Sequence, residues 1–190
     1  MHFAEGLLFK NYLHKKLSME FDINKSIEIL ERTPAVLTDL LSRLDDDWSM
    51  NNEGDETWSP YDIIGHLNHG ERTDWITRMN IILNEDDKRF IPYNRFAQFK
   101  ESEGKDLQQL LKEFTELRKN NVEKIKSLDL TDDDLNKTGI HPEFGEVTLK
   151  QLLSTWTIHD LTHITQITRV MAKQYKDAIG PWIKYFRVMQ

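Results

Sequence analysis

Four long stretches of this chain repeat their apolar residues every three or four positions, and this helical spacing constrains the fold more than any other feature. Runs that alternate apolar and polar residues, as strands do, are few, so a parallel sheet is not expected. The long connection 84–105 separates the second stretch from the third. The pattern predicts an all-α protein built as a four-helix bundle, with helices over residues 23–44, 59–83, 106–128 and 148–175.

Two of these helices carry clear start signals. Ser59 suits the N-cap of the second helix, Pro60 suits its first helical position, and Asp62 falls at the third. Thr148 and Gln151 have the spacing of a capping box, so the fourth helix should begin after Thr148.

The remaining segments are expected to be loops or extensions. Residues 45–58 and 129–147 are polar, and the tail beyond Gly180 has enough apolar bulk to pack onto the bundle. Pro34 should either kink the first helix or begin its main segment. Residues 1–18 lack the order of charge and apolar run found in a secretory signal. They are interpreted as an N-terminal extension, either an extra helix or a non-native start.

Composition narrows the class of protein. A chain of 190 residues that is 38% hydrophobic can bury one sizeable core. Its net charge of -7 argues against binding to nucleic acid or to an anionic membrane. No stretch approaches the roughly 18 apolar residues of a membrane span. The absence of cysteine excludes disulfides and thiolate metal sites and fits a reducing compartment. We expect a cytoplasmic protein that acts on a small molecule.

Three histidines are the candidate metal ligands. His159 and His163 lie four residues apart on one predicted helix, so their imidazoles share a face. That face also carries the apolar residues of the helix and therefore points into the bundle. His66 on the second helix lies on the flank of its apolar stripe and is the better third ligand, whereas His69 should point further outward. A three-histidine set would leave coordination positions open for water or substrate.

The spacing alone leaves a second interpretation open. A buried histidine is more often a hydrogen-bonded core residue than a metal ligand, and H-x-x-x-H pairs arise by chance. Asp160 stands where a zincin has glutamate, so a protease of that type is disfavoured. Asp62, Glu71, Asp74 and Asp160 could orient an imidazole or move a proton, although N-terminal capping alone explains Asp62. Gln166, one turn beyond His163, could contact substrate.

The segments around these histidines resemble the DinB/YfiT-like superfamily of metal-binding four-helix bundles. The matching motifs are W-S-P-Y-D-I-I-G-H-L-N-H-G-E around His66 and H-D-L-T-H-I-T-Q-I around His159 and His163, and the resemblance extends from Met19 to Gln190. It implies one DinB-like domain over 19–190 in which the three histidines bind a divalent metal. Thr162 departs from the many members with a histidine directly before the last ligand.

The resemblance implies two classes of chemistry. Some relatives are transferases or isomerases that use a low-molecular-weight thiol, and others are described as metal-dependent hydrolases. We therefore expect a metal-dependent transferase or hydrolase in which Ni, Zn, Mn or Fe activates a thiol cosubstrate or water. The alternative is a non-catalytic metal-binding bundle that serves as a stress-associated binding module or assembles as a homodimer.

Overall fold

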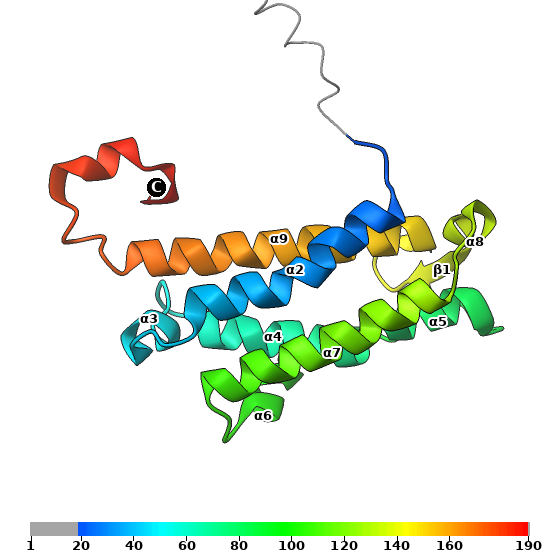
Figure 1. The fold of residues 1–190 in the computed structure, drawn as a ribbon, viewed down its shortest axis with the longest axis horizontal. Helices are drawn as coiled ribbons and strands as arrows, with labels where there is room; N and C mark the ends of the chain where they lie inside the picture. The colour runs from blue at the N-terminus through cyan, green and yellow to red at the C-terminus, as the bar shows by residue number, and fades with distance from the viewer. Residues whose placement is uncertain (1–18, 190) are drawn as a thin grey trace, which may run out of the picture.

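Helices dominate the computed structural model, which describes residues 19–189 (Figure 1). The interpretation of residues 1–18 as an extension lies outside the described residues. The long helices are α2 (Ile23–Leu41), α4 (Pro60–Thr73), α5 (Trp75–Asn84), α7 (Leu107–Ser127) and α9 (Leu149–Lys173). The short elements are α3 (Asp46–Met50), α6 (Ala97–Ser102), α8 (Asp132–Asn136), β1 (Thr138–His141), β2 (Gly145–Thr148), η1 (Gly180–Tyr185) and η2 (Arg187–Met189).

The bundle consists of two parallel pairs of helices. The N-terminal halves of α2 and α9 share one buried cluster with α5 and the end of α7. Their C-terminal halves share a second cluster with α4 and the start of α7. Helices α2 and α9 therefore run in one direction, and α4–α5 and α7 in the other, as Figure 1 shows. Because α5 and α7 are parallel, the chain must return along the bundle between them. This return is the reason for the long connection 84–105.

The predicted helix starts are confirmed in detail. Ser59 and Asp62 form a reciprocal capping box with Pro60 in the first turn of α4, and Thr148 and Gln151 form another at α9. The second predicted helix differs, because it breaks at Asp74 into α4 and α5. The first ends at Leu41, three residues earlier than predicted.

Segments predicted to be plain loops contain short ordered elements. Helices α3, α6 and α8 lie within them, and β1 pairs with β2 as an antiparallel hairpin. Ile140 also pairs in parallel with Arg89 of the long connection. This pairing brings Phe90 against Gly139, where an added Cβ would lie 2.4 Å from the Phe90 ring. A four-residue strand carries too few alternations to be recognised in a helical sequence.

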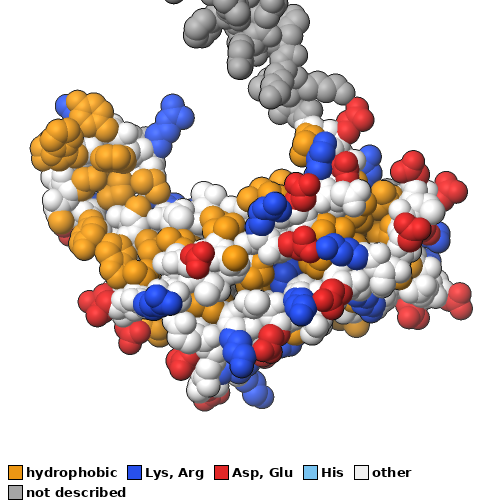
Figure 2. Space-filling model, viewed as in Figure 1, with side chains coloured by type: hydrophobic (Ala, Val, Ile, Leu, Met, Phe, Trp, Pro, Cys, Tyr) orange, Lys and Arg blue, Asp and Glu red, His pale blue; other side chains and the backbone are white. Residues whose placement is uncertain are grey.

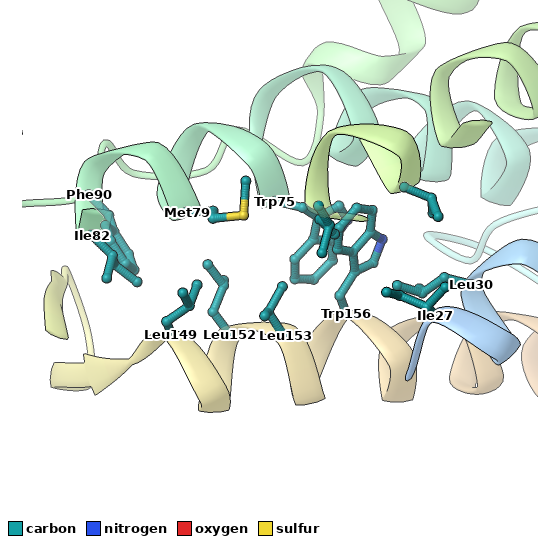
Figure 3. Packing of buried hydrophobic residues seen from close by; sticks show 12 residues of the cluster. Ile27, Leu30, Trp75, Met79, Ile82, Phe90, Leu149, Leu152, Leu153 and Trp156 are labelled. Carbon is teal, nitrogen blue, oxygen red and sulfur yellow. The ribbon is translucent and has the colours of Figure 1, made fainter. Parts of the chain in front are cut away.

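Large side chains from α5 and α9 fill the first core cluster (Figure 3). The rings of Trp75 and Trp156 stack with their centroids 5.6 Å apart. Met79 and Ile82 of α5 lie opposite Leu149, Leu152 and Leu153 of α9 in the same view. This packing fixes the position of α9 against the helices that precede it.

A buried ionic network crosses the bundle beside this cluster. Arg118 of α7 binds both carboxylate oxygens of Asp160, at 2.5 and 2.9 Å, and lies 2.8 Å from Glu71 Oε1. Helix α2 continues through Pro34, which has no N–H to offer the carbonyl of Leu30. Arg118 Nη1 donates to that carbonyl at 3.0 Å instead. One guanidinium thus joins α2, α4, α7 and α9.

The tail contacts α9 through η2, in which Met189 is buried. Several of its other large apolar residues stay exposed, including Trp182, Tyr185 and Phe186. Figure 2 shows hydrophobic side chains gathered over this end of the molecule. No helix within residues 19–189 combines the length and the hydropathy that crossing a membrane requires.

Candidate metal centre

Three imidazoles from two helices converge at one point. His66 lies on α4, and His159 and His163 lie one turn apart on α9. The Nε2 atom of His159 is 3.1 Å from the Nε2 atoms of both His66 and His163. Two nitrogens bound to one ion at about 2.0–2.1 Å lie roughly 3 Å apart when the coordination angle is near 90–100°. The spacing of the three nitrogens therefore matches a shared ion.

The outer ring nitrogens of two histidines have polar partners. His163 Nδ1 lies 2.8 Å from Gln166 Oε1, and His66 Nδ1 lies 3.3 Å from the Tyr93 hydroxyl. Because an amide oxygen can only accept, the His163 proton sits on Nδ1 and its Nε2 keeps a free lone pair. Such outer partners orient histidine ligands in metal sites. His159 Nδ1 is buried and has no hydrogen-bond partner among residues 19–189.

All three imidazoles are held in the neutral form that binds metals. Burial lowers the pKa of His66 to about 3 and that of His159 to about 2, and the charge of a protonated His163 would lower both further. Burial also lowers the pKa of His163, against the opposing effect of the Gln166 hydrogen bond. At neutral pH the three rings present lone pairs rather than charges.

The residues present fit a divalent cation. A single proton on His159 Nε2 can be donated to only one of the two nitrogens that face it at 3.1 Å. A cation between them would satisfy all three. Among the described residues, no fourth histidine or carboxylate joins the group, whose ligand atoms lie within 4.8 Å of one another. Three protein ligands leave coordination positions open.

Aromatic residues and a pocket surround the histidines. The rings of Trp58 and His66 lie 4.9 Å apart, and those of Trp75 and His159 lie 5.1 Å apart. A pocket of about 480 Å³ reaches His66 and His159, and the long connection and the hairpin line its other side. A small molecule could enter this space and reach the open side of the histidine group.

Comparison with known proteins places this arrangement in a family. A family model described as the DinB superfamily matches residues 29–167. The chain belongs to the DinB superfamily. A solved structure, YfiT from Bacillus subtilis, matches with a TM-score of 0.69 and 21% identity, over 84% of this chain and 91% of that one. That protein is described as a probable metal-dependent hydrolase with an unusual four-helix bundle topology. The likeness confirms the predicted fold. No curated protein matches the chain.

The other residues singled out in this DinB-superfamily chain have structural partners. The Asp62 carboxylate accepts from the backbone N–H and the hydroxyl of Ser59 in the capping box. Asp160 and Glu71 are buried against Arg118, and Glu71 also accepts from the indole of Trp156 at 2.9 Å. Asp74 forms an ion pair with Arg78 at the pocket wall. None of these carboxylates forms a hydrogen bond or ion pair with a ring of the histidine group. Gln166, which was predicted to contact substrate, lies 2.8 Å from His163 Nδ1.

One placement was wrong and several residues were missed. His69 does not point outward: it is buried beneath α6, with Nδ1 2.8 Å from Glu101. The reason is that α6, absent from the prediction, covers this flank of α4. Tyr93, Trp58 and Trp75, which surround the histidines, were not predicted to be site residues. Their only sequence signal was the concentration of aromatic residues in the segments flanking His66.

Proposed function

We propose that this chain is a metal-dependent enzyme in which His66, His159 and His163 hold a divalent ion that serves a transferase or a hydrolase reaction. The observation that carries the proposal is the convergence of three neutral imidazoles beside a pocket, with no fourth ligand among the described residues. When bound, such an ion lowers the pKa of a coordinated water or thiol and so supplies a nucleophile near neutral pH.

The roles of the chain's own residues follow from their contacts. Gln166 and Tyr93 contact the Nδ1 atoms of His163 and His66, which leaves the Nε2 atoms of both rings available to hold an ion. Trp58 and Trp75 pack against the rings and limit access of water from their side. Arg118 compensates the buried charge of Asp160, which adjoins His159 in sequence, and keeps that stretch of α9 in place. The pocket supplies the space for a small-molecule substrate and, in the transferase case, for a low-molecular-weight thiol.

Metal analysis combined with turnover tests this proposal. Protein purified without oxygen should contain close to one Ni, Zn, Mn or Fe ion per chain. It should consume electrophilic or ester substrates in the presence of a thiol or of water. His159→Ala should lose both metal and turnover while keeping its helical circular dichroism. A wild-type protein that takes up no metal after reconstitution would remove the basis of the proposal. Metal uptake without turnover would favour the non-catalytic alternative.

The exposed apolar tail favours a second role, assembly of two copies, which is compatible with the first. Trp182 and Tyr185 are each about two thirds exposed, which is unusual for side chains of their size. Sedimentation velocity should show a dimer that dissociates in Trp182→Ser/Tyr185→Ser. A wild-type monomer at micromolar concentration would count against assembly through the tail.

A further inference from the structure

Arg95 stands in the wall between two pockets beside the histidine group. One is the 480 Å³ pocket that reaches His66 and His159. The other, of about 690 Å³, is lined by Trp58 and by Gln166, whose partners are His66 and His163. Arg95 lines both pockets. A group bound in either pocket would therefore lie beside the same arginine.

Arg95 differs from the other arginines of these pockets in having no carboxylate partner. Arg78 is held by Asp74, and Arg169 by Glu53. Arg95 forms no ion pair with any residue between 19 and 189, and its guanidinium carbon lies over the ring of Phe96, 4.9 Å from the centroid. Stacking on a ring orients the guanidinium while leaving its N–H groups free to donate.

Among the described residues, no acidic residue that lines the two pockets forms an ion pair with Arg95. The other unpaired charges of the two pockets are Glu143 and Glu56, both exposed and both without an ion pair to Arg95. A substrate bound in the pocket that reaches His66 and His159 therefore shares that pocket with an arginine that has no ion pair among residues 19–189.

We propose that the substrate or cosubstrate of the metal centre carries a carboxylate, and that Arg95 binds it while the reacting end of the molecule faces the three histidines. Arginine is suited to this role because its planar fork matches a carboxylate in a bidentate geometry. The inference rests on the proposed function, since it requires an ion at the histidine group. It narrows the substrate class to small anionic molecules.

A matched pair of thiols tests the role of Arg95. Protein loaded with Co²⁺ is titrated with 3-mercaptopropionate and with 3-mercaptopropan-1-ol, and binding is followed through the cobalt absorption spectrum. The two probes share a thiol and a chain length and differ in the carboxylate. The ratio of their dissociation constants should favour the carboxylate by about tenfold more in wild type than in Arg95→Gln, since charge-assisted hydrogen bonds are being lost. Arg95→Lys should retain part of the preference.

Arg89→Gln is the matched control. Arg89 lies on the same connection, is exposed, and is paired with Asp87 away from both pockets. Its replacement should leave the ratio at the wild-type value. Equal ratios in wild type and Arg95→Gln would overturn the inference about Arg95 but not the proposed function. The same holds for a cobalt-loaded protein that binds neither thiol. A protein that takes up no cobalt would overturn the proposed function together with it.

Discussion

At the scale of single residues, the geometry of the centre depends on the outer partners of its rings. Gln166 Oε1 lies 2.8 Å from His163 Nδ1 and has no other polar partner among the described residues. We expect Gln166→Ala to raise the dissociation constant for Zn²⁺ about ten- to hundredfold, the range found for loss of such outer partners. Competition with a chromophoric chelator measures it. Thr165→Ala is the control, because its hydroxyl bonds only to the carbonyl of Leu161. Equal affinities would show that Gln166 does not orient the ring.

The buried histidines also predict how stability depends on pH. The pKa of His159 in the folded protein, about 2, lies below its ordinary value of 6.5. The neutral form therefore stabilises the fold fully above pH 6.5, and this stability is lost as the pH falls toward 2. Between pH 7 and pH 5 one such histidine removes about 2 kcal/mol from the free energy of unfolding. In urea unfolding with EDTA present, the free energy of unfolding should fall between pH 7 and pH 5 by about 2 kcal/mol less in His159→Gln than in wild type. The same loss in both proteins would contradict the assignment.

At the scale of elements, the β1–β2 hairpin is joined to the rest of the fold at Gly139. An added Cβ there would lie 2.4 Å from the Phe90 ring and 2.9 Å from Ile82. Because Phe90 is buried and paired to the hairpin through its backbone, Gly139→Ala should destabilise the protein by about 1–3 kcal/mol. Phe90→Leu in the same chain should recover part of the loss, as thermal or urea unfolding would show. If the losses of the two single variants simply add in the double variant, the added Cβ at position 139 does not clash with the Phe90 ring.

At the scale of the whole molecule, Arg118 connects four helices through buried contacts. Its removal leaves the carboxylates of Glu71 and Asp160 buried without a counter-charge. We expect Arg118→Met to lower the free energy of unfolding by about 3–5 kcal/mol. Lys119→Met is the control, since Lys119 is exposed, and it should change the value by less than about 0.5 kcal/mol. An Arg118→Met protein as stable as wild type would show that the network is dispensable.

The sequence by itself determined what is encoded within one helix. Apolar spacing located the four long helical stretches, although not the break between α4 and α5. The Ser59 and Thr148 boxes set two helix starts, and the four-residue spacing of His159 and His163 placed both rings on one face. These features depend on contacts between residues a few positions apart, which a single chain segment contains. Family resemblance then supplied His66 as the third member.

Only the tertiary structure decided which residues of different elements contact one another. His66 is 93 positions from His159, Tyr93 is 27 from His66, and Arg118 is 42 from Asp160. Such pairs leave no periodic trace in the sequence, because their distance depends on how the helices pack and on the path of the long connection. For the same reason the hairpin, α6 and the burial of His69 were not predicted. The convergence of the three Nε2 atoms and the pocket beside them belong to the packing of α4 against α9.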